Sequence, residues 1–279
     1  MLPRRLLSPR AVLAMPRPRQ SRSQHLPLSS ASPSSASALS LDRRFSAAAA
    51  PGLPSTDTKM AAPKITLYVD IVSPFAYIAY HVLRNSPVFA KCTTTYVPVL
   101  LGGIIQATGN TPPIRIKNKD KWINVERLRW SKLLGVPITE AMPDGFPVFT
   151  LAVQRALCVV AADHPEKLAG CIDALYNTLW VKRDSSVIKP EGYVPVLETV
   201  IGKDAAIKVA EKANTAEIKQ KLVSNTDRSV ESGAFGLPWM ECTNSKGETE
   251  SFFGVDHLGQ VVAFLGLDGT LGQGFKALL

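Results

Sequence analysis

The sequence predicts an α/β fold in which strands from both ends of the folded part share one sheet, with an all-helical segment inserted between them. Three observations support this prediction. A strand, a helix and a second strand follow one another within residues 65–99, residues 101–227 show helical spacing alone, and two strands and a helix come after residue 238. A strand–helix–strand unit of this length is expected to be parallel and right-handed.

The first unit opens with residues 65–70, a short run (ITLYVD) rich in β-branched and aromatic residues that is typical of a largely buried strand. Ser73 followed by Pro74 is typical of a helix start, because a hydroxyl caps the first turn and proline fits the first helical position. Apolar residues then recur at helical spacing up to Leu83, and residues 93–99 form the second predicted strand.

The middle of the chain shows no convincing strand and no internal repeat. Apolar residues recur at near-helical spacing from Trp122 through Val125 and Leu128 to Leu133. Four further runs also favour helices: residues 151–162, 165–179, 194–201 and 205–222.

The end of the chain returns to strands. Residues 239–243 and 248–253 predict a hairpin around a turn at residues 244–247, and residues 256–267 predict a closing helix. The order of elements matches a thioredoxin-like domain interrupted by an all-helical insertion. We assign residues 60–100 and 228–279 to the thioredoxin-like domain, residues 101–227 to the helical insertion domain, and residues 1–59 to a leader.

The leader has the composition of a mitochondrial transit peptide. Residues 1–59 contain eight arginines, one lysine, no glutamate and only two aspartates, among many serines, alanines and prolines. We therefore expect a mitochondrial protein. The alternatives are a disordered tail without an address, or translation from Met60, which would leave a peroxisomal or cytoplasmic protein.

Charge, hydropathy and cysteine spacing exclude several function classes. Most of the net charge of +9 lies in the leader, so the folded part is close to neutral and does not favour nucleic-acid binding. No apolar run is long enough to span a membrane. The four cysteines are far apart without a Cys-x-x-Cys pair, which argues against a zinc site and a dithiol redox centre and favours a reducing compartment. We expect no metal.

Four motifs in a fixed order give the chain a family resemblance. With them, residues 63–267 resemble a kappa-class glutathione transferase, from the family related to bacterial thiol–disulfide oxidases and to 2-hydroxychromene-2-carboxylate isomerase. The motifs are Asp-Ile-Val-Ser-Pro-Phe at 70–75, Thr-Gly-Asn-Thr-Pro-Pro at 108–113, Gly-Ala-Phe-Gly-Leu-Pro at 233–238 and Phe-Gly-Val-Asp-His at 253–257.

The resemblance implies that glutathione is the co-substrate and that Ser73 is the catalytic residue. Ser73 takes the place of the attacking cysteine of the redox relatives, and Ala76 takes the place of their second cysteine, so this site has no thiols for disulfide exchange. A helix N-terminus favours an anion, and the Ser73 hydroxyl can donate to a glutathione thiolate while it caps the helix. The alternative is that Ser73 is a plain helix cap.

The resemblance also implies the residues that hold glutathione. Leu237 and Pro238 match the cis-proline turn, whose backbone binds the cysteinyl part of the tripeptide. Asn110 matches an amide that holds glutathione from the insertion side, and we assign Lys119 to the glycyl carboxylate. The alternatives are an ordinary loop asparagine and a solvated basic stretch.

The segment at residues 255–257 is expected to bind the γ-glutamyl end of glutathione. Backbone N–H groups suit its carboxylate, and Asp256 suits its ammonium group. The family usually has Ser-Asp-Arg here, whereas this sequence has Val255 and His257 around Asp256. Asp256 can also be an ordinary helix-start acid.

Together these features predict a homodimeric glutathione transferase that conjugates small electrophiles. The first alternative is a glutathione-dependent isomerase on the same scaffold, in which the thiol adds and leaves again. The second is a non-catalytic thioredoxin-like binding module, which the changes at Val255 and His257 favour.

Overall fold

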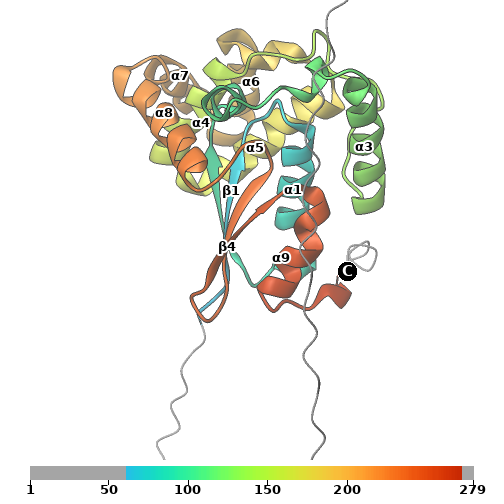
Figure 1. Ribbon diagram of the computed structural model, residues 1–279. Coiled ribbons are helices and arrows are strands. Elements are labelled where there is room, and N and C mark those ends of the chain that lie inside the picture. Colours follow the sequence, from blue (N-terminus) through green and yellow to red (C-terminus); the bar gives the residue numbers. More distant parts are fainter. Residues whose placement is uncertain (1–60, 272–279) are drawn as a thin grey trace, which may run out of the picture. The chain divides into compact units, whose positions relative to one another are not determined.

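A computed structural model describes residues 61–271 (Figure 1). The leader predicted over residues 1–59 lies outside the described residues, and mitochondrial import stays a prediction. The division into a thioredoxin-like domain and a helical insertion domain also stays a prediction.

The four predicted strands are present and form one mixed sheet. The strand order is β2-β1-β3-β4, with β1 parallel to β2 and antiparallel to β3, and β3 antiparallel to β4. The parallel pair confirms the predicted βαβ unit. The strands are β1 (Lys64–Val69), β2 (Thr93–Pro98), β3 (Trp239–Thr243) and β4 (Thr249–Phe253).

The first helix begins where the sequence predicts. Helix α1 (Pro74–Asn85) follows Ser73, whose side chain caps it, and Pro74 occupies the first helical position. Its inner face buries Ile78 and Leu83 together with Ile65 of β1 in the main apolar core. Side chains of β1 are buried on both faces of the sheet, because Ile65, Leu67 and Val69 pack in the main core and Tyr68 packs in a second cluster with Ala76.

Helices occupy the segment between β2 and β3, and the described part of residues 101–227 contains no strand. Four details differ from the sequence predictions. The helix expected over 194–201 begins earlier, at Pro190, and the run expected over 165–179 divides into a 3₁₀ turn (Pro165–Lys167), a helix (Leu168–Tyr176) and a π-helical turn (Asn177–Val181). The run expected as one helix over 205–222 is two helices, because Thr215 accepts a hydrogen bond from the Ile218 N–H (3.4 Å) and starts a new one. A short helix after β2 was not predicted. The helices are α2 (Leu101–Thr108), α3 (Lys119–Leu134), α4 (Leu151–Asp163), α5 (Leu168–Tyr176), α6 (Pro190–Ile201), α7 (Lys203–Lys212) and α8 (Ala216–Glu231).

The closing helix is shorter than predicted. A 3₁₀ turn over Val255–His257 precedes α9 (Leu258–Phe264), whose buried face carries Leu258, Val261 and Val262. No helix within residues 61–271 is both long and apolar enough to cross a membrane.

One end of the sheet collects the segments that bear the predicted site. Tyr68, Trp239 and Phe253 lie opposite one another on β1, β3 and β4. Since β3 runs against its two neighbours, β1 and β4 end near this row and β3 begins there. The turns after β1, before β3 and after β4 therefore meet at one edge. Helices α4 to α8 gather at this end of the strands (Figure 1).

Candidate active site

Ser73 lies at the start of α1 with its hydroxyl engaged as a cap. Its Oγ accepts a hydrogen bond from the Ala76 N–H (3.1 Å), and its own N–H donates to the Asp70 carbonyl (3.0 Å). The residue is buried, with 4% of its surface exposed. The hydroxyl hydrogen of Ser73 has no acceptor among residues 61–271, so it is still free to donate.

The turn that leads to Ser73 is held by aromatic side chains from the helical segment. The Tyr176 hydroxyl donates to the Asp70 carbonyl (3.3 Å), and the Trp180 Nε1–H donates to the Ile71 carbonyl (2.8 Å). These bonds satisfy carbonyls that the sheet leaves unpaired at its end. The helical segment thus fixes the backbone just before the helix start.

Asp70 is a second polar residue at this turn, and its role was not predicted. Its side chain is fully buried and accepts hydrogen bonds from the Val72 N–H (3.2 Å), the Leu101 N–H (2.8 Å) and the Thr150 hydroxyl (2.7 Å). Burial raises the pKa of the Asp70 carboxyl to about 6, against the opposing effect of these donors. The sequence feature that could have indicated this role is an acidic residue placed directly after a buried strand.

Leu237 and Pro238 lie beside the start of α1. The Leu237–Pro238 peptide is cis, as the resemblance implies, and a second cis bond joins Phe146 to Pro147. Leu237 packs in a small apolar cluster with Ala76 of the first turn of α1. Neither the N–H nor the C=O of Leu237 has a hydrogen-bond partner in the described part of the chain, so both can pair with an extended peptide.

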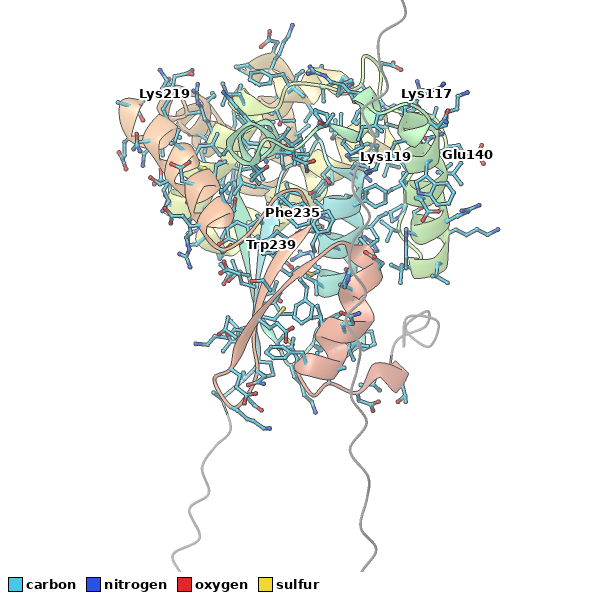
Figure 2. The ribbon with its side chains drawn as sticks, in the orientation of Figure 1. Lys117, Lys119, Glu140, Lys219, Phe235 and Trp239 are labelled. Atoms are coloured by element: carbon cyan, nitrogen blue, oxygen red, sulfur yellow. The ribbon has the colours of Figure 1, made fainter. Side chains whose placement is uncertain are left out.

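Asn110 reaches the same turn from the end of α2. Its Nδ2 donates to the Phe235 carbonyl (2.7 Å), and its Oδ1 accepts from the Thr111 N–H (2.8 Å). The ring of Phe235 lies 4.5 Å from that of Phe253, and Figure 2 shows Phe235 next to Trp239. The structure therefore brings the second and third motifs into contact.

The fourth motif joins this turn through its backbone. The Gly254 N–H donates to the Pro238 carbonyl (3.0 Å). Val255 is buried, whereas Asp256 is exposed and its Oδ1 lies 3.3 Å from Nδ1 of His257. The Asp256 carboxylate also folds back over Gly254, where an added Cβ would lie 2.3 Å from Oδ1.

Lys119 is the one predicted site residue that the structure does not bring to this cluster. It is exposed at the first position of α3, and no hydrogen bond or ion pair joins it to another predicted site residue within residues 61–271. Figure 2 shows Lys119 apart from Phe235 and Trp239.

The cysteines of the chain are not activated nucleophiles. All four thiols are free, and burial raises the pKa of Cys158, Cys171 and Cys242 to about 12 and raises that of Cys92. A thiolate reaction at neutral pH needs a thiol with a lower pKa. Such a thiol would have to come from another molecule.

The fold is that of a known class. The sequence profile of the DsbA-like thioredoxin domain matches residues 64–266. The chain belongs to the DsbA-like thioredoxin domain family.

Two similar proteins are named as kappa-class glutathione transferases. The chain is 27% identical to glutathione S-transferase kappa 1 of Caenorhabditis elegans, over 70% of this chain and 87% of that protein. It is also 27% identical to the protein of the same name from Rattus norvegicus, over 73% of this chain and 91% of that protein. The resemblance to kappa-class glutathione transferases is thereby confirmed.

A solved structure of 2-hydroxychromene-2-carboxylate isomerase shares the fold. It has a TM-score of 0.59 and 20% identity, and the match covers 73% of this chain and 94% of that one. The predicted fold class, a thioredoxin-like α/β fold with a helical insertion, is confirmed.

Proposed function

We propose that this protein is a glutathione transferase of the kappa type, which joins the glutathione thiol to small electrophiles. One observation carries the proposal. The Ser73 hydroxyl caps α1 and keeps its hydrogen free, in a chain whose relatives are named glutathione S-transferase kappa.

The proposed chemistry stabilises a thiolate that glutathione supplies. The first N–H groups of α1 and the positive end of its dipole favour a negative charge, and the Ser73 hydroxyl donates a hydrogen bond to the sulfur. The thiol loses its proton to solvent, and the sulfur then attacks an electrophilic carbon. A carbon–sulfur bond forms while the leaving group departs with its electron pair. Ser73 stabilises the nucleophile and forms no covalent bond.

The proposed binding site uses the turns that meet at the end of the sheet. The free N–H and C=O of Leu237 pair with the cysteinyl backbone, and Asn110 contacts the tripeptide from the side of α2. Exposed Asp256 binds the ammonium group of the γ-glutamyl end. The backbone N–H groups of Val255 and His257 bind the carboxylate of the same end. Lys119, which lies apart, meets the glycyl carboxylate only if the start of α3 moves toward the site.

Burial of Ser73 places a condition on this proposal. With 4% of the residue exposed, a sulfur atom reaches the hydroxyl only if the neighbouring turns move when glutathione binds. The Leu237 turn packs against the first turn of α1 and has backbone groups that are unpaired within residues 61–271, so we propose that it moves.

The assay uses the full chain with glutathione and a chlorinated nitrobenzene. The proposal predicts a stable conjugate with release of chloride, and a Ser73→Ala variant that turns over more slowly because the thiol of the bound glutathione has a higher pKa. An absence of both glutathione binding and turnover would exclude the transferase. An unchanged pH–rate profile in Ser73→Ala would remove Ser73 from the mechanism.

A glutathione-dependent isomerase is the second candidate, and the shared fold with 2-hydroxychromene-2-carboxylate isomerase favours it. In that reaction the thiol adds to the substrate and leaves again, so glutathione is returned. Product analysis separates the two: a conjugate supports the transferase, and an isomer with unchanged glutathione supports the isomerase. Absence of heat in a glutathione titration would instead favour the non-catalytic module.

Dimerisation and mitochondrial import are part of the same proposal. Sedimentation of the purified chain would give twice the mass of one chain if it forms a homodimer. A fluorescent fusion to residues 1–59 would enter mitochondria if the leader is a transit peptide, and a diffuse signal would contradict it.

A further inference from the structure

Asp70 connects the starts of three helices. Its carboxylate accepts hydrogen bonds from Val72, in the turn before α1, from Leu101, the first residue of α2, and from Thr150, the residue before α4. The positive ends of helices favour a carboxylate at such a place. A single buried side chain therefore joins segments that are 31 and 80 residues apart from it in sequence.

Two of these helices have no side-chain cap of their own. The residue before α2 is Leu100, which has no polar side chain, so the Asp70 carboxylate satisfies an N–H that has no partner within the helix. The residue before α4 is Thr150, whose hydroxyl donates to Asp70 and does not cap its own helix. Asp70 thus replaces a local cap at α2 and anchors the start of α4.

The same bonds reach the two segments that carry Ser73 and Asn110 of the candidate site. On one side, Asp70 holds Val72 and Ser73 through its carboxylate and its carbonyl. On the other side it holds the start of α2, a helix of eight residues that ends two residues before Asn110. We propose that Asp70 is a positioning residue, whose carboxylate fixes Ser73 relative to Asn110 so that both meet one ligand. This inference rests on the proposed glutathione site.

Protonation of Asp70 would weaken this connection. All three partners present hydrogens to the carboxylate, and a protonated carboxyl has one acceptor position fewer and one donor more. Its pKa of about 6 places the change between pH 5 and 7. Among the described residues that bond to Asp70, Val72, Ser73, Leu101 and Thr150 do not titrate in this range, and Tyr176, from α5, has a pKa raised well above 10 by burial.

Calorimetric titration of the full chain with glutathione at pH 5, 6 and 7 tests the proposal. Since glutathione binds the form with ionised Asp70, the dissociation constant should rise about tenfold from pH 7 to pH 5 in the wild type. Asp70→Asn should bind at least tenfold more weakly at pH 7, with no such change with pH. Asp163→Asn, the same substitution at the last residue of α4, is the matched control and should keep the tenfold change.

Hydrogen exchange gives a second measurement that does not need glutathione. In Asp70→Asn, the backbone amide hydrogens of residues 71–76 and 101–110 should exchange faster than in the wild type, whereas those of the hairpin of β3 and β4 should not. If Asp70→Asn does not fold, Thr150→Val is used in its place, because it removes one hydrogen bond to the carboxylate. Thr150→Ser keeps the hydroxyl and should restore wild-type exchange and affinity.

The outcomes separate this proposal from the proposed function. If the wild type binds no glutathione at any pH, the proposed function fails, and hydrogen exchange alone decides the role of Asp70. Unchanged exchange in residues 101–110, or a wild-type pH dependence of binding in Asp70→Asn, would overturn the positioning role.

Discussion

Replacing Asp70 by asparagine should change how the free energy of unfolding depends on pH. Burial raises the pKa of this carboxyl from 3.8 to about 6 in the folded protein. A group with a raised folded pKa contributes stability below the unfolded pKa, and this contribution is lost as the pH rises through the folded pKa. The wild type should therefore lose stability through Asp70 between about pH 4 and pH 6.

The size of this effect follows from the two pKa values. One pKa unit corresponds to about 1.4 kcal/mol, so the full change is about 3 kcal/mol. Asparagine has no such titration. If the NH₂ group of the asparagine faces the Leu101 N–H, it cannot accept that hydrogen bond. The unpaired N–H then lowers the free energy of unfolding by about 1–3 kcal/mol at every pH. The pH dependence, not the offset, is thus the informative quantity.

The assay is urea unfolding of the wild type and of Asp70→Asn at several pH values from 4 to 7. The free energy of unfolding of the variant minus that of the wild type should rise by about 2 kcal/mol from pH 4 to pH 7, because other carboxylates titrate alike in both proteins and cancel. Parallel stability curves would contradict this prediction, since they would mean that Asp70 has an ordinary pKa in the folded protein.

Three further predictions concern the site. Ser73→Ala should lower the stability by about 1 kcal/mol, because the helix cap is lost. The same variant should raise the pKa of the bound glutathione thiol, which thiolate absorbance measures. An unshifted thiol titration would contradict the role of the hydroxyl. Asn110→Ala should weaken glutathione binding in calorimetry without a change in turnover at saturation, and equal affinity would exclude the contact. Gly254→Ala should destabilise by about 1–3 kcal/mol, because its φ is +89° and Asp256 occupies the place of a Cβ. In thermal melts the matched Gly102→Ala, in α2 with open space, should be neutral or stabilising, and equal losses would refute the argument.

The sequence predicted those elements whose signals are local. The strand before Ser73, the Ser73-Pro74 helix start and the hairpin of β3 and β4 each depend on neighbouring residues, and all three are present. The sequence did not predict that the helical run over 205–222 divides at Thr215. A threonine within such a run caps a new helix only when the chain changes direction there.

Features that depend on distant partners were not predicted. Helix α2 contains two glycines and no cap of its own, so its start depends on a carboxylate 31 residues away.

The exposed face of α3 was also not predictable from spacing. Trp122, Val125 and Leu133 have helical spacing on α3 but are 54%, 41% and 45% exposed, since spacing does not say which face the rest of the chain covers. In the candidate site, the motifs indicated the residues around Ser73, while the supporting bonds from Thr150, Tyr176 and Trp180 could not be read from spacing.

A crystal structure of the full chain with bound glutathione would show whether Ser73 contacts the reacting sulfur. We expect the glutathione sulfur within hydrogen-bond distance of the Ser73 hydroxyl, at the start of α1, with the cysteinyl backbone paired to Leu237. A glutathione molecule bound elsewhere, or a Ser73 hydroxyl still covered and out of reach of the sulfur, would contradict it.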